Sequence, residues 1–468
     1  MASMFQQGSA KVLFWVFILF CLVTGAYLLT GGDPGALRLP GGLFHGERRE
    51  PPWKSPAEPM AKPLPTGIPA AAMTARATGP PDVRRSPEAT AAPASSSEPQ
   101  DDDESRLMTL PYLTRAPSAK KDLNKRGVVA FRRGACAGGL NLYASNTTSE
   151  AYLMDMEGKR LHTWRTNSLR PWQNVAVDPD GNLLFLEVGF LIGKLDWGSR
   201  PIWSYETRCH HWISAAGDGD IYTLSWERLP VDHKGRKISI LNDSIIHLSP
   251  WGTLRKRLSL YESLGTFVPQ SDLDLAGEMR SPPRPGSPAD IFHTNTVFRV
   301  EREVPGVCSK GDLLISMKQM KTIAFLDPEK NRVVWRWQND SIEGVHSPVL
   351  LANNHILFVD NGGIAWQYCR VLELDPLTGK IVYEYRDDST PKDFASSPGS
   401  VEVLGNGNML ITESTRGRVF EVTRKGSVVW DFFNPEMDGT KRSAIFRMTR
   451  LSPSLSGSLM EKLGRGNP

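Results

Sequence analysis

A short unit that recurs six times in the C-terminal three quarters of the chain constrains the fold more than any other feature. Each copy begins with Asp, Ser or Thr, turns at Gly or Asn, and continues in a β-rich run that in five copies ends in an aromatic residue. The first residue can cap its own turn and Gly tolerates positive φ, so each copy predicts a β-hairpin. The copies begin at Asp155, Asp196, Ser249, Asp327, Asp375 and Thr423.

A second hairpin unit falls between these copies, at Asp178, Ala216, Leu351 and Leu404, and leads into an inner, mostly apolar strand. Two hairpins make a four-stranded sheet, and a period of about 40 to 50 residues is the size of one propeller blade. The sequence therefore predicts an all-β, six-bladed β-propeller over residues 126–450, without an amphipathic helix. Aromatic residues of the repeat are expected to pack between blades: Trp164, Trp203, Trp335 and Trp430.

An uncharged apolar run, residues 12–29, lies near the N-terminus. About 18 residues at 1.5 Å each roughly span the hydrocarbon core of a bilayer. A poor cleavage site follows the run, which favours an uncleaved transmembrane signal anchor with residues 1–11 as a short cytoplasmic head. Residues 30–125 are rich in Pro, Ala and Ser and predict a disordered stem. Residues 451–468 are expected to be a flexible tail.

Sequons and cysteines favour export of the folded part. The sequons at Asn146, Asn242 and Asn339 are candidate glycosylation sites. Positive charges around the apolar run do not decide its orientation. We expect a single-pass type II membrane protein of the Golgi, the wider secretory pathway or the cell surface, with a lumenal or extracellular propeller. In an oxidising compartment, the four cysteines outside the apolar run predict two disulfides of unknown pairing: Cys136, Cys209, Cys308 and Cys369.

Charge and motif content exclude several classes of function. The formal net charge is only +4 over 468 residues, and no Lys/Arg stripe is present, so nucleic-acid binding is not expected. The cysteines and histidines lack zinc-site spacing, and no metal site is predicted. The chain has no dinucleotide-binding glycine motif, P-loop or nucleophilic-serine elbow.

Four histidines share a position in the predicted repeat. His210 and His211, His293, and His346 each stand at the start of the innermost strand of a blade. A Pro-rich insertion, SPPRPGSPAD, lies just before His293 and is expected on a loop face. Innermost strands surround the central channel, so these histidines could form one polar pocket.

Group transfer is the chemistry that such a pocket suits. A neutral imidazole is a good nucleophile near pH 7 and can also transfer protons. A sulfuryl group carries negatively charged oxygens, whose transfer requires cationic and N–H donors. Lys318 follows the strand GDLLIS, and Asn295 lies two residues from His293, on the same face of a strand.

Several stretches resemble the bacterial aryl-sulfate sulfotransferases, members of the arylsulfotransferase family. They are AYLMDMEGKRLHTW, DIFHTN, GDLLISMKQMKTIAFLDPEKNRVVW, HSPVLLANNHILFVDNG and GSVEVLGNGNMLITESTRGRVFEVTRKGSVVW. The similarity spans roughly residues 138–450. It implies a six-bladed propeller that moves a sulfuryl group from an aryl sulfate to a phenol through a sulfohistidine. The family needs no nucleotide sulfate donor, so no cofactor is expected.

The resemblance also assigns roles residue by residue. His346 matches the family's nucleophile, and His293 with Asn295 matches its His-x-Asn pair, which contacts the sulfuryl group and the phenolic oxygen. The His210–His211 pair matches a further pocket histidine, with His211 preferred. Lys318 stands where the family typically has Arg; Lys keeps the charge and loses the planar fork that binds two oxygens.

Two functions follow from these observations. The first is a membrane-anchored transferase that acts on a phenolic or aryl sulfate-type small molecule, with His346, His293, His211 and Lys318 as catalytic residues and Asn295 and His210 as substrate-binding residues. The alternative is a non-catalytic propeller of the secretory pathway or cell surface that binds a ligand or a protein. Lys318 in place of Arg favours the alternative, because fold alone does not determine activity.

Overall fold

A computed structural model of the protein describes residues 115–118, 120–278, 289–362, 369–386 and 399–464. The apolar run at 12–29, and with it the predicted anchor and head, lies outside these residues, as do Cys21 and most of the predicted stem. Within the described ranges, no helix combines the length and apolar character needed to cross a bilayer.

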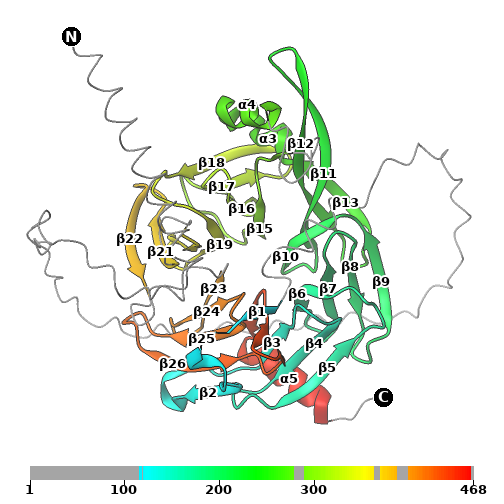
Figure 1. Ribbon diagram of the computed structural model, residues 1–468, viewed down its shortest axis with the longest axis vertical. Coiled ribbons are helices and arrows are strands. Elements are labelled where there is room, and N and C mark those ends of the chain that lie inside the picture. The colour runs from blue at the N-terminus through cyan, green and yellow to red at the C-terminus, as the bar shows by residue number, and fades with distance from the viewer. Residues whose placement is uncertain (1–114, 119, 279–288, 363–368, 387–398, 465–468) are drawn as a thin grey trace, which may run out of the picture. The chain divides into compact units, whose positions relative to one another are not determined.

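Six antiparallel sheets follow one another along the chain, and each is one blade of a propeller (Figure 1). Blades 1 to 3, each from its inner to its outer strand, contain β29 (Met448–Arg450), β3 (Asn141–Ala144), β4 (Glu150–Met154) and β5 (Arg160–Arg165); β6 (Trp172–Val177), β7 (Leu183–Glu187), β8 (Leu191–Leu195) and β9 (Pro201–Glu206); and β10 (Cys209–Ala215), β11 (Ile221–His233), β12 (Arg236–Leu248) and β13 (Leu254–Ser259).

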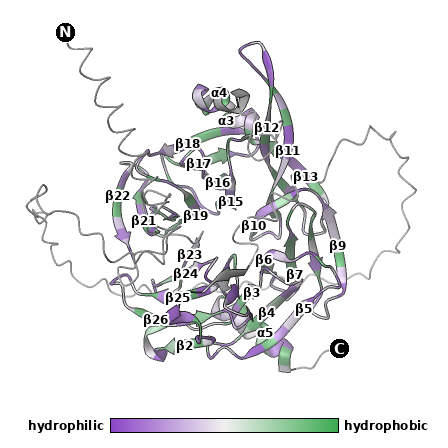
Figure 2. Cartoon of the chain, in the orientation of Figure 1, coloured by the Kyte–Doolittle hydropathy of each residue, from purple (hydrophilic) through white to green (hydrophobic). Residues whose placement is uncertain are grey.

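Blades 4 to 6 repeat this arrangement and complete the predicted number. They contain β15 (Thr294–Arg299), β16 (Leu313–Met317), β17 (Thr322–Asp327) and β18 (Arg332–Gln338); β19 (Val345–Leu350), β20 (Ile356–Asp360), β21 (Arg370–Asp375) and β22 (Lys380–Tyr385); and β23 (Gly399–Val403), β24 (Met409–Glu413), β25 (Arg418–Val422) and β26 (Val428–Phe433). The all-β, six-bladed propeller predicted from the repeat is confirmed. Hydrophobic residues lie on the strands of every blade (Figure 2).

Both ends of the folded part close the ring. The C-terminal strand β29 pairs with β3 and supplies the innermost strand of blade 1. At the other end of the fold, β2 (Gly127–Phe131) pairs with β26 and adds a fifth strand to blade 6. Segments about 300 residues apart in sequence are therefore joined by backbone hydrogen bonds, and blade 1 is completed to four strands.

The two recurring hairpin units occupy equivalent places in the blades. The first unit is the turn between the third and fourth strands of all six blades, and the second is the turn between the first and second strands of blades 2, 3, 5 and 6. In blade 1 the Oδ1 of Asp155 accepts hydrogen bonds from the backbone N–H groups of Glu157 and Lys159, at 3.0 and 2.8 Å. Gly158 completes that turn at φ +87°, so the predicted turn chemistry is confirmed.

A hydrogen bond from the fourth strand of each blade to a turn carbonyl of the next blade repeats around the ring. It explains why aromatic and other donor side chains recur in the fourth strands, and it gives His162 a structural role. Trp335, expected among these residues, packs on Phe325, and Trp337 makes the bond. The six donor–acceptor pairs are His162–Trp197, Trp203–Pro250, Lys256–Pro328, Trp337–Gly379, Tyr383–Arg424 and Trp430–Met156.

Blade 3 carries an insertion that the repeat did not predict. Its strands β11 and β12 form a long hairpin with a hydrophilic tip (Figure 2). Helices α3 (Leu260–Leu264) and α4 (Gln270–Glu278) follow β13 and contact the hairpin. The two-residue strand β14 (Ala289–Asp290) then pairs in parallel with β12. The expectation that the fold lacks helices was therefore wrong for this insertion.

The structure differs from the expected boundaries at both ends of the propeller. In the predicted stem, β1 (Arg115–Pro117) pairs with β28 (Lys441–Ser443), which also pairs with β27 (Met437–Asp438). The buried Asp122 forms an ion pair with Arg416 at 2.5 Å. In the predicted tail, α5 (Pro453–Gly464) buries Leu459 against blades 1 and 2. Tertiary burial, which local composition does not reveal, orders both segments.

The cysteines of the described ranges form no disulfide. They are Cys136, Cys209, Cys308 and Cys369, and the last three are buried. Cys209 starts the inner strand of blade 3, Cys308 lies in the loop after β15, and Cys369 precedes β21. The prediction of two disulfides was wrong: the four cysteines are spread over separate parts of the fold, and none is bonded to another.

Two of the three predicted glycosylation sites are buried. Asn146 is 0% exposed and its side-chain oxygen accepts a hydrogen bond from the backbone N–H of Phe446. Asn242 is 1% exposed and its amide donates to the Oγ of Ser259 at 3.0 Å. Neither amide can carry a glycan in this fold. Asn339, in the turn after β18, is half-exposed and stays a candidate.

Candidate active site

The four histidines stand where the innermost strands of blades 3, 4 and 5 begin. His210 and His211 are in β10, His293 immediately precedes β15, and His346 is the second residue of β19. A β-bulge interrupts the pairing of all three strands nearby. Positive φ values of 59°, 48° and 52° occur at His211, His293 and Ser347. Such values are uncommon for residues other than glycine and often accompany functional sites.

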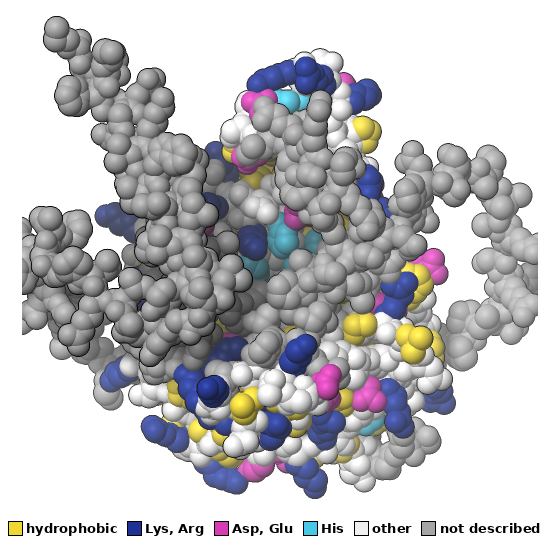
Figure 3. All heavy atoms as spheres, in the orientation of Figure 1, with side chains coloured by type: hydrophobic (Ala, Val, Ile, Leu, Met, Phe, Trp, Pro, Cys, Tyr) yellow, Lys and Arg dark blue, Asp and Glu magenta, His cyan; other side chains and the backbone are white. Residues whose placement is uncertain are grey.

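Histidine side chains gather in a hollow at the centre of one face, next to a basic side chain (Figure 3). The rings of His210 and His211 have centroids 5.0 Å apart, and those of His211 and His293 are 5.3 Å apart. The charges of His346 and Lys318 both act on His211. The fold therefore brings together side chains that are up to 136 positions apart in the sequence.

His211 is held from three sides. Its Nδ1 lies 2.7 Å from the Nδ1 of His210, so one ring donates and the other accepts. Its backbone N–H donates to the Oε1 of Gln173 at 2.7 Å, and its carbonyl accepts from the Nδ2 of Asn174 at 2.9 Å. Burial, together with the neighbouring cationic groups, lowers the pKa of His211 well below its ordinary value of 6.5. His211 is therefore a neutral imidazole near pH 7.

Two aspartates flank the histidine row. Asp243 contacts the Nε2 of His210 at 3.4 Å and accepts a hydrogen bond from the backbone N–H of Thr294 at 2.7 Å. At the other end, the Oδ2 of Asp290 lies 2.6 Å from the Nδ1 of His293. Burial acts to raise the pKa of Asp290, but the charge and hydrogen bonds of His293 outweigh it and lower that pKa below 3.8. Asp290 therefore fixes His293 with its Nδ1 as donor.

His346 is a neutral imidazole with a defined tautomer. Its Nδ1 lies 3.1 Å from the carbonyl oxygen of Gly344, so the proton is on Nδ1 and the lone pair on Nε2. Burial lowers the pKa of His346 to about 3, the charges of Lys318 and His293 act in the same direction, and the bond to Gly344 opposes them. The Nδ2 of Asn361 lies 3.3 Å from Nε2.

Lys318 brings a positive charge to His346. It lies in the turn between β16 and β17, and its backbone N–H donates to the carbonyl of His293 at 3.1 Å. Its aliphatic carbons run past Gly344, where a Cβ would approach them to 3.7 Å. Among the residues that the structure describes, no hydrogen bond or ion pair to its ammonium group is found. The charge is therefore available to an anion.

Asn295 has a different setting from the one expected. Its amide donates to the carbonyl of Val345 at 2.7 Å, and its oxygen accepts from the hydroxyls of Thr296 and Ser316 at 3.1 and 2.6 Å. The side chain is 1% exposed. These contacts join blade 4 to the residue that precedes His346. The substrate-binding role of Asn295 stays a prediction.

Sequence reasoning missed three polar residues of the site. Asp290 could have been found, because it lies three residues before His293 and caps that turn through its bond to the backbone N–H of His293 at 2.9 Å. Asp243 lies on an inserted hairpin and Asn361 follows a strand of blade 5. Neither lies near one of the four candidate histidines in the sequence, so no local signal pointed to them.

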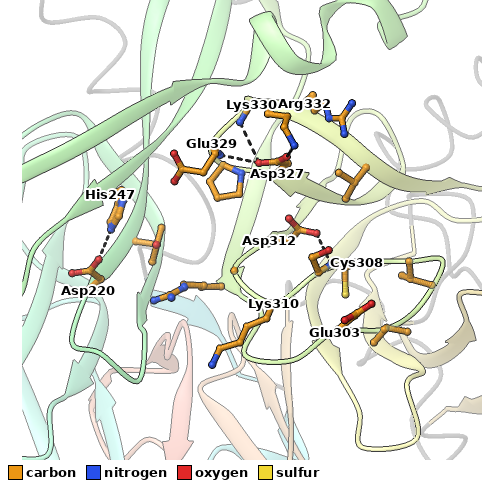
Figure 4. A pocket seen from close by; sticks show the side chains of 18 of the residues that line it. Asp220, His247, Glu303, Cys308, Lys310, Asp312, Asp327, Glu329, Lys330 and Arg332 are labelled. Atoms are coloured by element: carbon orange, nitrogen blue, oxygen red, sulfur yellow. Dashed lines mark hydrogen bonds and ion pairs between the residues drawn. The ribbon is translucent and has the colours of Figure 1, made fainter.

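A cavity of about 740 Å³ lies at the opposite end of blades 3 and 4 (Figure 4). The turns after β10 and β17 and the loop after β15 line it, and the four candidate histidines do not. Its charged groups pair largely with one another: Asp220 with His247 at 2.7 Å, Asp327 with Lys330 at 3.2 Å, and Asp218 with Arg299. The histidine hollow is therefore the better candidate for chemistry.

The side chains of the hollow bear on whether it could hold a metal ion or an anion. Across the described ranges, no group of three or more His, Cys, Asp or Glu side chains is arranged to hold a metal ion. The hollow instead offers neutral imidazoles, one ammonium group, a carboxylate hydrogen-bonded to His293 and a second carboxylate 3.4 Å from His210. Such a set suits binding and transfer of a small anion.

Comparison with solved structures returned low similarity. A Bacteroides caccae protein of unknown function is 12% identical over 66% of this chain and 98% of its own, with a TM-score of 0.44. A Staphylococcus aureus virginiamycin B lyase is 12% identical over 67% and 89%, with a TM-score of 0.37. The WD40 β-propeller domain of Doa1 is 12% identical over 70% and 98%, at 0.41. These three structures are too dissimilar to support an inference about this chain.

Comparison of sequences gave one assignment. No curated protein matches this chain. The sequence model of the family described as Arylsulfotransferase (ASST) matches residues 191–435, which is more than half of the chain. The match runs from β8 in blade 2 to the end of blade 6 and includes the four histidines and Lys318. The chain therefore belongs to the arylsulfotransferase family.

Proposed function

We propose that the protein moves a sulfuryl group from an aryl sulfate to a phenol or similar hydroxyl through a sulfohistidine at His346. The observation that carries this proposal is the state of His346: a neutral imidazole whose Nδ1–H is bound to Gly344, with the charge of Lys318 acting on the ring. A nucleophile needs that lone pair, and a sulfuryl group needs that charge.

The first half of the reaction transfers the group to the enzyme. The Nε2 of His346 attacks the sulfur of the aryl sulfate, and the N–S bond forms as the bond from sulfur to the aryl oxygen breaks. The oxygen leaves with the bonding pair as a phenolate. Lys318 and the ring of His293 stabilise the sulfuryl oxygens, and Asp290 holds that ring in place.

The second half returns the enzyme to its starting state. The hydroxyl of the acceptor gives its proton to His211, a ring that burial keeps neutral before the acceptor binds. The acceptor oxygen then bonds to sulfur as the N–S bond breaks, and the electron pair returns to Nε2 of His346. His211 releases the proton to solvent. His210, hydrogen-bonded to His211 through Nδ1, keeps His211 oriented.

The test uses the full chain and p-nitrophenyl sulfate. Exposure to the donor alone should add the mass of one sulfuryl group to the peptide that contains His346, and a phenol added afterwards should remove it. His346→Ala should lose both, while His355→Ala, in the same blade but in the turn before β20, should keep both. An unlabelled His346 peptide in the wild-type protein would reject the proposal.

The alternative is a propeller that binds a sulfated ligand without turnover. Lys318 favours it, because an ammonium group lacks the planar fork with which Arg binds two oxygens at once. This function predicts saturable binding of p-nitrophenyl sulfate that depends on Lys318, without release of p-nitrophenol or labelling of His346.

We further propose that the propeller is anchored to a membrane as a type II protein and faces the lumen or the exterior. The apolar run at 12–29 and the half-exposed sequon at Asn339 support this placement. The absence of a disulfide among the four described cysteines does not. Carbonate extraction of membranes and glycosidase shifts of the Asn339→Gln variant test it. Release by carbonate together with an unshifted wild-type band would reject it.

A further inference from the structure

Asn361 shares one backbone carbonyl with His346. Asn361 lies directly after β20, and its backbone N–H donates to the oxygen of Gly344 at 2.9 Å. The Nδ1 of His346 lies 3.1 Å from that same oxygen. One carbonyl therefore fixes the imidazole ring and the backbone of Asn361 relative to each other. This holds independently of any contact made by the side chain of Asn361.

The side chain of Asn361 lies between His346 and Cys369. Its Nδ2 is 3.3 Å from the Nε2 of His346, and its Oδ1 is 3.7 Å from the Sγ of Cys369. A thiol donates one weak hydrogen bond, and an amide oxygen can only accept it. The amide nitrogen must then face His346. The same orientation follows from His346, whose Nε2 carries the lone pair and accepts a hydrogen bond.

We infer that Asn361 is a further residue of the transfer site, which caps the lone pair of His346 and then binds the transferred group. This inference rests on the proposed sulfuryl transfer. The amide N–H points at the atom that attacks sulfur, so the incoming group must displace it. Once the N–S bond has formed, that N–H is next to the sulfuryl oxygens and donates to one of them, while Cys369 retains the amide oxygen.

The matched control is a second Asn–His pair in the same blade. The Nδ2 of Asn353 lies 3.2 Å from the Nδ1 of His355, in the turn between β19 and β20. That turn is at the other end of the strand from His346. The Nδ1 of His355 also lies 2.7 Å from the Oε1 of Glu373 and donates to it, so the amide of Asn353 caps no lone pair there. Asn353→Ala therefore removes an amide beside a histidine of the same blade without touching the site, and it separates loss of the cap from a general effect on blade 5.

The first experiment measures the cap without any sulfate. Diethyl pyrocarbonate places a carbethoxyl group on an imidazole nitrogen and releases ethanol and carbon dioxide, and peptide mass mapping gives the rate at each histidine. Loss of one hydrogen bond to Nε2 should make His346 react about 3- to 10-fold faster in Asn361→Ala. In Asn353→Ala the His346 rate should equal that of the wild type.

The second experiment follows the sulfuryl adduct on His346 after mixing the full chain with p-nitrophenyl sulfate. Loss of one donor to the developing charge should slow adduct formation about 10- to 100-fold in Asn361→Ala. Asn361→Asp should be at least as slow, because its carboxylate repels the sulfuryl oxygens. Asn353→Ala should form the adduct at the wild-type rate.

The outcomes separate this inference from the proposed function. A wild-type protein that forms no adduct rejects sulfuryl transfer, and the carbethoxylation rates still decide whether Asn361 caps His346. A wild-type protein that forms the adduct, with Asn361→Ala unchanged in both rates, overturns the inference alone. Faster carbethoxylation together with slower adduct formation in Asn361→Ala supports both halves of it.

Discussion

The Nε1 of Trp430, in the last blade, donates a hydrogen bond of 2.9 Å to the carbonyl oxygen of Met156, in the first blade. The two residues are 274 positions apart. Equivalent bonds join each of the other blades to the next. This one lies where the ring closes, beside the pairing of β29 with β3, so its loss acts on the junction between the two ends of the fold.

Trp430→Phe should lower the free energy of unfolding by about 1 to 3 kcal/mol, because it leaves the carbonyl of Met156 without its donor and opens space in a buried site. Denaturant unfolding followed by far-UV circular dichroism measures the change. Trp203→Phe is the control: it removes the same bond, to Pro250 at 3.1 Å, from a partly exposed ring away from the closure. Equal losses in the two variants would contradict a special role for the closure.

The repeat predicted the blades but not how the ring closes. The six turn units could be recognised in the sequence because each needs a capping side chain and Gly or Asn at fixed positions. Strand β29 has three residues and no turn unit, so nothing local distinguishes it from the segment before it. Helix α5 was not predicted for a related reason. Its stability comes from the packing of Leu459 on blades 1 and 2, which is a tertiary contact.

The site was predictable only in part. The histidines could be placed because each occupies the same position in a repeated unit. Equivalent positions of neighbouring blades lie close together in a propeller, so the repeat predicts that these side chains meet. Asp243 and Asn361 could not, because they reach the site from elements with no matching register. Asn295 was placed on the correct strand. Its side chain donates to the carbonyl of Val345 in the next blade, and the sequence could not predict that contact because it depends on how the two blades pack.

Lys318 should be the main determinant of donor binding. Lys318→Ala should lower kcat/KM for p-nitrophenyl sulfate about 100-fold, because it removes the positive charge that acts on His346. Lys318→Arg should retain or raise the activity, since a guanidinium group can bind two sulfuryl oxygens. Steady-state release of p-nitrophenol measures both.

The control for Lys318 is Lys321→Ala, in the same turn. The Nζ of Lys321 lies 3.5 Å from the Oε1 of Glu343 and donates to the carbonyl of Asp340, so its positive charge is paired outside the site. It should leave kcat/KM within about twofold of the wild type. A Lys318→Ala variant as active as Lys321→Ala would remove Lys318 from the site.

Asp290 should act through His293. Asp290→Asn keeps the shape of the side chain but replaces a charged acceptor 2.6 Å from the Nδ1 of His293 with a neutral amide. We expect adduct formation on His346 to slow about 10-fold or more, with the unfolding midpoint little changed. Asp274→Asn breaks a similar pair, with His233 at 2.7 Å on the inserted hairpin, and should leave transfer unchanged. Equal rates in the two variants would show that the Asp290–His293 pair does not serve transfer.

Stability should fall in mild acid because His346 is buried as a neutral ring. Its folded-state pKa of about 3 lies below the ordinary 6.5, so between those values the unfolded chain binds more protons than the folded one. The free energy of unfolding must then rise with pH across that window. The contribution of His346 alone makes it about 2 kcal/mol lower at pH 5 than at pH 8. His211, whose pKa is also lowered by burial, acts in the same direction. Urea midpoints at pH 5 and pH 8 should differ less in His346→Gln than in the wild type, whereas an equal difference would show that His346 is not the buried neutral group.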